Sequence, residues 1–477
     1  MAVSGLATRP GWPEEAAARL QSQTAKALRQ ARETGAPQLV SVTMRVATTL
    51  DPSALIAGAR RTGEPWFCFE QPEREGFALA ALGCVRTLES AGPRRFEAVS
   101  DAWHAVVSRA ITDFDGGPPG SGLVAVGGFA FAPDGGASPT WNGFAPASLV
   151  VPELSVVRSG GESWVTLTAT VAPDDTESDV SARARRRLSE CSRGQLPLMD
   201  PAPAGSYRIV SPMPPAHYEE AVARAVARIR GGELEKIVLA RQVDVHAPRP
   251  HDPAAVLGVL RECFESSFVF AVGRGDATFV GATPELLIRS QGQRASTVAL
   301  AGSARRSADP AVDDHLAEAL LRSDKDRHEN AIVARRIERA LRPHAVWVAA
   351  APEPAVVKVA NIQHLACPIR AQLASPLGAL TLAGALHPTP AIGAEPASAV
   401  ELIPALEGFD RGWYAGAVGW TDSSGDGEFC VALRSALLRD QLACCYAGCG
   451  IVADSEPAAE LAESELKLQV MLPVLAG

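Results

Sequence analysis

The chain lacks an excess of basic residues. Its 477 residues include 45 Lys and Arg against 54 Asp and Glu, which gives a net charge of −9. A general nucleic-acid-binding protein needs a basic footprint, so this balance argues against a nucleic-acid partner. A small anionic ligand is still allowed, because a few well-placed Arg and Lys side chains suffice to bind it.

Export and membrane signals are also missing. The first residues, "MAVSGLATRPGWPEEAAARL", lack a charged segment followed by an apolar one, and no apolar stretch is long enough to span a bilayer. The nine cysteines are odd in number and scattered. Cys444, Cys445 and Cys449 cluster without the paired spacing of a zinc site. We therefore expect buried strand cysteines, a cytoplasmic location and no membrane contact.

The order of the expected elements favours an α+β fold. Apolar residues make up 47% of the chain and charged residues 21%, a globular composition. Helical periodicity covers residues 14–34 and 177–192, and strand patterns dominate between about 38 and 180. Residues 194–215 are rich in Pro and Gly, so we divide the chain into halves 1–205 and 206–477. Helices stand between hairpins and not in strict alternation with strands, which favours α+β over a doubly wound sheet.

The second half continues this mixture. Gly231 and Gly232 are a fitting stop for a helix over 216–232. One or two helices are expected over 313–341, and a last one over 456–470. Strands are expected at 234–245, 268–273, 278–289, 295–300, 414–420, 428–438 and 442–452.

Lys236 is a candidate general base. It lies in the apolar strand segment "KIVLA" and shares a face with Val238 and Ala240. A lysine on a buried face is costly unless it has a partner or a lowered pKa. The alternative is a lysine at the entry of the strand, with its ammonium extended to water.

Glu285 is a candidate general acid. The segment "FVGATPE" runs from a strand into a turn, and Pro284 stiffens that turn. A rigid turn can hold an acid in place. An ordinary turn glutamate is the alternative.

Other polar residues also allow two interpretations. In "LAGSARR", Gly302 lets a ligand approach the backbone and Ser303 can bind an anion. Glu329 follows Lys325 by four residues on a helix, so it could form a surface ion pair or bind a metal. Arg434, expected in the middle of a strand, needs an anionic ligand or an internal salt bridge.

The final helix carries a charged face. Glu460, Glu463 and Lys467 follow i, i+3, i+7 and lie on one side, after Asp454 and Ser455 as candidate N-caps. The face could simply be solvated, or its carboxylates could hold a cation.

Together these stretches resemble the chorismate-utilising enzymes, and among them isochorismate synthases most. The resemblance runs from about 215 to 471. It is carried by "KIVLAR", "GATPELL", "LAGSARR", "SDKDRHEN", "NIQHL", "LHPTPAIG", "FDRGWYAGAVGW", "VALRSA", "AGCGIV" and "ELAESELK". It implies one large α+β domain of two packed antiparallel sheets flanked by helices, with residue 205 between two halves of that domain.

The resemblance implies a Mg²⁺-dependent conversion of chorismate to isochorismate, in which water adds at ring carbon 2 and the hydroxyl at carbon 4 leaves. Lys236 would be the base that activates water, and Glu285 the acid that protonates the leaving hydroxyl. The pKa of Glu285 should then be raised by an apolar site or a nearby carboxylate. Glu329 and Glu463 would hold Mg²⁺, with Glu460 as a direct or water-linked ligand.

The remaining implied residues bind the substrate. Arg434, Tyr414 and Lys467 would bind the enolpyruvyl carboxylate. The pocket would also include Gly302, Ser303, Gly450 and His364.

Further residues separate this chain from its relatives. Lys236 fits a water nucleophile, so no glutaminase subunit is expected. Ala391 matches isochorismate synthases, whereas salicylate and anthranilate synthases tend to carry threonine. Asn330 and Ala394 depart from the family pattern and put only local geometry in doubt. "NIQHL" and "GFDRGWYAG" favour menaquinone synthesis, while "LAGSARR" fits siderophore enzymes equally. The related enzymes are often monomers.

Overall fold

The structure is a computed structural model that describes residues 14–46, 49–114, 116–191, 194–200, 205–359 and 361–476. Most of the quoted N-terminal segment, and part of the expected boundary at 201–204, lie outside these ranges. None of the described helices is both long enough and apolar enough to cross a bilayer.

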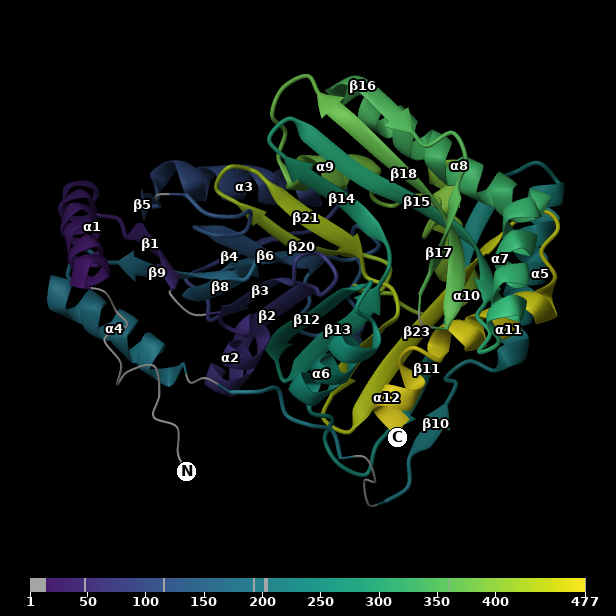
Figure 1. Cartoon of the computed structure of the whole chain (residues 1–477), viewed down its shortest axis with the longest axis horizontal. Coiled ribbons are helices and arrows are strands. Elements are labelled where there is room, and N and C mark those ends of the chain that lie inside the picture. The colour runs from purple at the N-terminus through teal and green to yellow at the C-terminus, as the bar shows by residue number, and fades with distance from the viewer. Residues whose placement is uncertain are drawn as a thin grey trace.

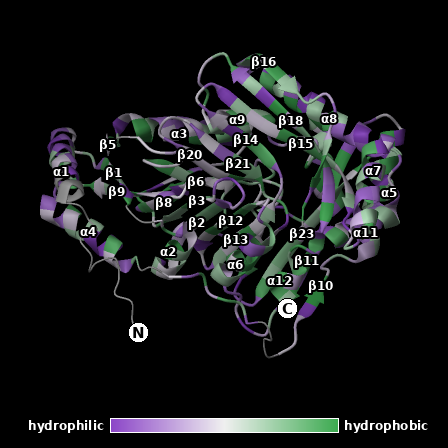
Figure 2. Ribbon diagram, viewed as in Figure 1, coloured by the Kyte–Doolittle hydropathy of each residue, from purple (hydrophilic) through white to green (hydrophobic). Residues whose placement is uncertain are grey.

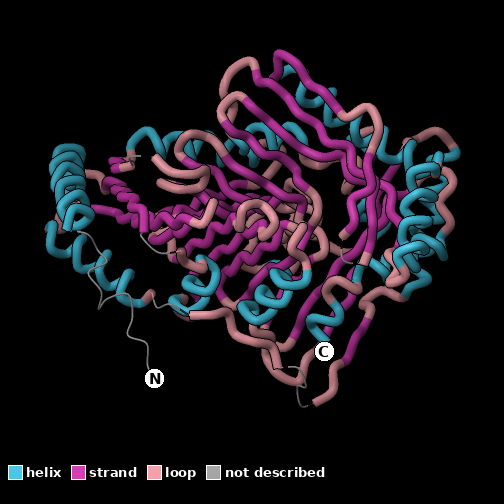
Figure 3. Tube along the Cα trace, in the orientation of Figure 1, coloured by secondary structure: helices cyan, strands magenta, loops and turns pink. Residues whose placement is uncertain are grey.

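The described strands form two large sheets that pack face to face, with helices on the outside (Figures 1 and 3). The first sheet, in spatial order, contains β10 (Arg208–Val210), β11 (Lys236–His246), β23 (Leu442–Ile451), β22 (Ser435–Arg439), β13 (Ala277–Thr283), β12 (Phe268–Gly275), β2 (Gly63–Gln71), β3 (Phe77–Leu82), β8 (Leu154–Ser159), β9 (Glu162–Val171), β1 (Gln38–Val46) and β5 (Ile111–Asp113), with β19 (Ala394–Glu395) beside β11. The second contains β16 (Ala345–Ala350), β18 (Ile362–Leu373), β15 (Arg294–Arg305), β14 (Leu286–Gln291), β21 (Gly427–Val431), β20 (Ala417–Asp422), β6 (Val124–Phe129), β7 (Ala147–Val151) and β4 (Arg86–Ser90), with β17 (Ala355–Lys358) beside β18.

The helices surround these sheets. They are α1 (Glu14–Thr34), α2 (Pro52–Ala59), α3 (Arg95–Arg109), α4 (Glu177–Glu190), α5 (Pro215–Arg230), α6 (Pro253–Cys263), α7 (Pro310–Arg322), α8 (Asp324–Leu341), α9 (Ala379–Leu386), α10 (Ile403–Glu407), α11 (Pro457–Leu468) and α12 (Leu472–Ala476). Pairing is antiparallel apart from β1 with β5. The expected α+β architecture of two packed sheets in a single domain is therefore confirmed. Both sheets take strands from both halves of the chain.

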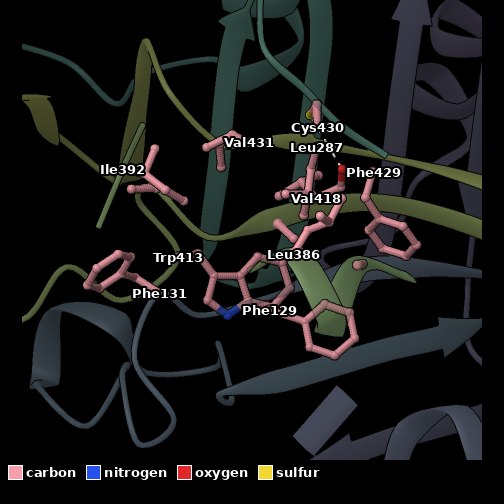
Figure 4. Packing of buried hydrophobic residues seen from close by; sticks show 14 of the residues in the cluster. Phe129, Phe131, Leu287, Leu386, Ile392, Trp413, Val418, Phe429, Cys430 and Val431 are labelled. Atoms are coloured by element: carbon pink, nitrogen blue, oxygen red, sulfur yellow. Dashed lines mark hydrogen bonds between the residues drawn. The ribbon is translucent and has the colours of Figure 1, made fainter. Parts of the chain in front are cut away.

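The main core lies between the two sheets, and it follows from alternation along the strands. In β2, Phe67 and Phe69 face this core, while Cys68 faces a second core that α2 and α6 help to cover. Figure 2 shows apolar residues concentrated in the central strands and polar residues on the outer helices. Figure 4 shows one part of the core, where Trp413 and Phe129 pack near Leu386 and Val418.

Helix ends agree with the local sequence, with one correction. Ser323 caps α8 and so separates it from α7, and Gly232, with φ of 78°, ends α5. The expected caps of the last helix are wrong: Glu456 is the N-cap, without a side-chain bond. Ser455 instead accepts a hydrogen bond from the Val452 amide, which closes the preceding turn. Cys444, Cys445 and Cys449 are buried on β23, as expected.

Two segments that were each expected to form one strand are divided into two strands in the structure. The segment 278–289 breaks at Pro284 and Glu285, between β13 in the first sheet and β14 in the second. The segment 428–438 breaks at 432–434, between β21 and β22, so the expectation that Arg434 lies in the middle of a strand is wrong. Its φ is 49°, a left-handed conformation that a continuous strand excludes. The apolar patterns run across both breaks because both sheets are buried.

Candidate active site

A cavity lies where the chain crosses between the two sheets. The chain crosses at residues 284–285 and again at 432–434, and a strand next to each crossing bonds to the other crossing. The Val431 amide donates to the Glu285 carbonyl at 3.0 Å, and the Ala282 amide donates to the Arg434 carbonyl at 3.1 Å. These bonds fix Glu285 and Arg434 at the cavity wall.

Twelve of the thirteen residues expected at the site line this cavity, and Lys236 lies directly behind the wall. The lining residues among them are Glu285, Gly302, Ser303, Glu329, His364, Ala391, Tyr414, Arg434, Gly450, Glu460, Glu463 and Lys467. They come from segments far apart in the sequence. Among these elements, α8 packs against β15 and α11 packs against β23 (Figure 1).

Lys236 is fully buried, with 0% of its surface exposed, so the alternative of a water-facing lysine is excluded. Its Nζ lies 2.9 Å from Oε1 of Glu329. That ion-pair contact lacks hydrogen-bond geometry, and no other described residue accepts a hydrogen bond from the Nζ. A Cβ at Gly450 would lie 2.8 Å from Cε of Lys236 and 2.2 Å from Oε1 of Glu329. Only glycine at 450 therefore leaves room for this pair.

Glu285 is held in a form that suits an acid. Only 4% of its surface is exposed, and burial raises its pKa to about 8. Lys236, Lys467 and Arg434 oppose this rise without cancelling it. Near neutral pH the carboxyl group therefore keeps its proton, as the resemblance implied.

Three lysines neutralise the three glutamates of the charged wall. Lys236 pairs with Glu329, Lys325 with Glu460 at 3.1 Å, and Lys467 with Glu463 at 2.8 Å. The i, i+4 pair that the sequence suggested between Lys325 and Glu329 is not the one formed. Both side chains line the cavity, and each meets a partner from another element.

The carboxylates differ in their electrostatics. Burial, and then Glu463, raises the pKa of Glu460. Burial also opposes ionisation of Glu463, but Lys467, Lys325 and Arg434 together outweigh it and lower the pKa of that carboxyl. Glu465 is off this face and its side chain is 60% exposed, 3.8 Å from Arg241.

The donor set fits a hard cation. Ligand atoms of Glu460, Glu463 and Cys449 lie within 4.8 Å of one another, while Glu329 is directed to Lys236. Burial raises the pKa of the Cys449 thiol well above its usual value, and its Sγ donates to the Glu460 carbonyl at 3.4 Å. A protonated thiol is a poor ligand, so carboxylate oxygens are the available donors, and these suit Mg²⁺.

A hydrogen-bonded chain links Arg434, His364 and Ser303. Burial, Arg434 and Lys467 hold the pKa of His364 well below its usual value, so the ring is neutral. Nη2 of Arg434 donates to Nε2 at 3.2 Å, which leaves the ring proton on Nδ1, 3.0 Å from Oγ of Ser303. Ser303 then accepts from the ring, and its own proton is free for a ligand.

Further polar atoms in this part of the cavity also lack partners. Nη1 of Arg434 is buried and has no hydrogen-bond partner among the described residues. Burial raises the pKa of Tyr414 to about 12, so its hydroxyl stays protonated.

Gly302 has φ of 83°, and a Cβ there would come within 2.9 Å of Cβ of Asp326. The departures Asn330 and Ala394 are both buried, and Asn330 donates to the Ala299 carbonyl at 3.0 Å.

Three charged residues of the wall were not singled out from the sequence: Lys325 as a cavity residue, Asp326 and Arg411. All three belong to motifs that carried the resemblance, "SDKDRHEN" and "FDRGWYAGAVGW". The motifs were the available signal, but the spacing within them does not show which side chains point inward.

The family described as chorismate binding enzyme matches residues 26–476. The chain belongs to this family.

Its relatives include isochorismate synthases. The salicylate biosynthesis isochorismate synthase of Pseudomonas aeruginosa is 37% identical over 95% of this chain and 93% of its own length. The isochorismate synthase MenF of Bacillus subtilis is 30% identical over 94% and 96%. The solved structure of the menaquinone-specific isochorismate synthase MenF of Escherichia coli covers 95% of this chain and 100% of its own, with a TM-score of 0.73 and 23% identity. That last likeness establishes the fold.

Proposed function

We propose that this chorismate-binding enzyme converts chorismate to isochorismate by adding water at ring carbon 2 while the hydroxyl at carbon 4 leaves. One observation carries the proposal: a buried lysine and a buried, protonated glutamic acid, Lys236 and Glu285, serve the same cavity. Water addition with loss of a hydroxyl needs both a base and an acid. The names of the relatives support the same reaction.

Lys236 is the proposed base. The amine must be neutral when it takes a proton from water, which then attacks carbon 2. Its buried Nζ lies 2.9 Å from Glu329 and has no hydrogen-bond partner among the described residues, so its hydrogen-bonding capacity is left for a reacting water. Glu285 is the proposed acid, because it is protonated near neutral pH and can give that proton to the departing hydroxyl.

Chorismate carries two carboxylates, and the cavity offers unused donors for them. The free Nη1 of Arg434, the Ser303 hydroxyl and the Tyr414 hydroxyl would bind the enolpyruvyl carboxylate together with Lys467. His364 would orient Ser303 from behind.

Glu329, Glu460 and Glu463 would hold Mg²⁺. When bound, the ion would supply the positive charge that lets an acidic wall accept the ring carboxylate. The protein's own part is to place hard oxygen donors beside the cavity and to keep the Cys449 thiol protonated.

The decisive experiment incubates purified protein with chorismate and Mg²⁺, without glutamine or a second enzyme, and follows products by chromatography. We expect isochorismate to accumulate. Accumulation of salicylate and pyruvate would instead establish a salicylate synthase, and no consumption of chorismate would refute the proposal.

The use of the product is a separate proposal. The sequence motifs favour menaquinone synthesis, and the name of the Bacillus subtilis relative supports it. The alternative is siderophore synthesis. The Pseudomonas aeruginosa relative is named for salicylate biosynthesis, so its name does not support menaquinone synthesis. The genes that neighbour this one decide between them. A monomer without a glutaminase subunit, in the cytoplasm, stays a prediction that size-exclusion chromatography and cell fractionation test.

A further inference from the structure

A gap in the first sheet is filled by two side chains. The outer edge of β11 pairs with β19 at residues 236–237 and with β10 at residues 244–246. Between these short strands, the Val238 carbonyl and the Ala240 amide lack a strand partner. Unpaired backbone groups are costly when buried, and Val238 and Ala240 are both buried.

The buried Glu407–Arg411 ion pair occupies this gap. Nη2 of Arg411 donates to the Val238 carbonyl at 2.9 Å, and the Ala240 amide donates to Oε1 of Glu407 at 2.6 Å. Nε of Arg411 donates to Oε2 of Glu407 at 2.9 Å, which joins the two side chains. The pair therefore replaces one donor and one acceptor of the missing strand.

Arg411 also binds the 391–393 loop, which lies along the outer edge of β11. Its Nη1 donates to the Ile392 carbonyl at 2.8 Å, and the next carbonyl, that of Gly393, accepts from the Val238 amide at 2.7 Å. Ala391, which lines the cavity, is the neighbouring residue. The guanidinium of Arg411 lies 4.2 Å from the centre of the Phe131 ring.

All three nitrogens of Arg411 thus donate to protein oxygens. Although Arg411 reaches the cavity wall, its guanidinium is committed to the scaffold. Its three acceptors lie on β11, on the 391–393 loop and on α10. These connections join the strand that begins at Lys236 to the loop that carries Ala391.

We propose that Glu407 and Arg411 form a positioning unit that sets Lys236 and the Ala391 loop at their working separation. Neither residue is proposed to touch the substrate. The effect on turnover rests on the proposed function, because Lys236 acts in it as the base. A displacement of about 1 Å at a reacting group can cost on the order of 100-fold in rate.

Arg411→Lys is the main test, because lysine keeps the charge but cannot donate in three fixed directions. We expect kcat for chorismate to fall about 10- to 100-fold, while KM changes little. Binding should persist because Arg434 and Lys467 belong to other elements. In hydrogen exchange, the amides of residues 236–241 should lose protection in this variant.

Glu407→Gln is the second variant, and it keeps the test available if Arg411→Lys fails to fold. Its amide oxygen can still accept the hydrogen bond from the Ala240 amide. It should show the same pattern with a smaller loss. If the pair acts as one unit, the double variant should be no worse than the poorer single variant. Additive losses would overturn the idea of a unit.

Glu428→Gln is the matched control. Glu428 is equally buried and pairs with Arg74 and Arg289, but it does not line the cavity. It should lower the melting temperature and leave kcat and the protection of 236–241 unchanged. A folded Arg411→Lys enzyme with normal kcat and normal exchange would overturn the inference. If the wild-type protein makes no isochorismate, the proposed function fails, and the exchange measurement still tests the link between Arg411 and β11.

Discussion

Two sets of buried ion pairs in this molecule use different cations. In the cavity wall, Glu329, Glu460 and Glu463 each pair with a lysine. In the scaffold, the buried carboxylates Glu407 and Glu428 pair with arginines. Each set contains buried carboxylates, Glu329 and Glu460 in the wall and Glu407 and Glu428 in the scaffold, so burial alone does not explain the choice.

The difference follows from the chemistry of the two cations. Arginine presents a planar fork of donors and keeps its charge, so Arg411 can tie three backbone or side-chain groups at once. Lysine is a point charge on a flexible stem that can give up its proton and its partner. The proposed site would have to release carboxylates to a metal and take a proton from water, and lysine suits both tasks. A scaffold benefits from arginine.

The largest expected effect comes from replacing Lys236, the cation that pairs with Glu329 behind the cavity wall. Lys236→Arg keeps a positive charge beside Glu329 but removes a group that can become a base, and Lys236→Ala removes both. We expect either change to lower kcat about 100- to 10,000-fold, measured as the initial rate of chorismate loss. Circular dichroism should show folded protein. Unchanged turnover in the folded Ala variant would end the general-base role.

The next largest effect concerns the carboxylates. Glu463→Ala should weaken Mg²⁺ binding at least about 10-fold, because metal sites lose affinity steeply when an oxygen donor is removed. Isothermal titration with Mg²⁺ alone measures this without relying on activity. A surface interpretation of the last helix predicts no change. Glu465→Ala, on the exposed side of the same helix, is the matched control.

The pH dependence tests Glu285. Its raised pKa, about 8, means that the carboxyl is protonated below this value and ionised above it. A general acid must hold its proton, so ionisation of Glu285 should add a basic limb that falls about tenfold per unit above pH 8, beside the acidic limb that protonation of the base contributes. Glu285→Gln should abolish this basic limb and lower the rate. A profile in the wild type that stays flat from pH 7 to pH 10 would contradict the assignment.

The sequence predicted the fold class and twelve of the residues that line the cavity, because the motifs that carry the family resemblance contain them. It indicated the turn at Pro284 but not the break at Arg434, since the strands beside that crossing are buried and the apolar pattern continues across it. Pro284 was the visible signal for one break. For the other, only the left-handed backbone of Arg434 marks the crossing, and no residue type announces it.

Pairing was harder to predict than position. Lys325 and Glu329 have ideal helical spacing, yet each meets a partner from another element. The spacing rule describes an isolated helix surface, and this face of α8 is a cavity wall. The Glu407–Arg411 pair depends on a gap between two short strands, β10 and β19, which appears only after the sheet is assembled.

The smallest expected effect concerns Lys325, the most exposed of the three wall lysines. Its ammonium neutralises Glu460, so it should compete with a divalent cation for that carboxylate. Lys325→Met should therefore bind Mg²⁺ more tightly, and Lys325→Arg, with its firmer fork, should bind it more weakly. We expect shifts of only a few-fold, because the pair is partly open to water and screened by it. Titration calorimetry of both variants with Mg²⁺ measures the sign. If both substitutions weaken binding, Lys325 supports the metal site instead of competing with the ion, and the view of wall lysines as exchangeable counter-charges fails at this position.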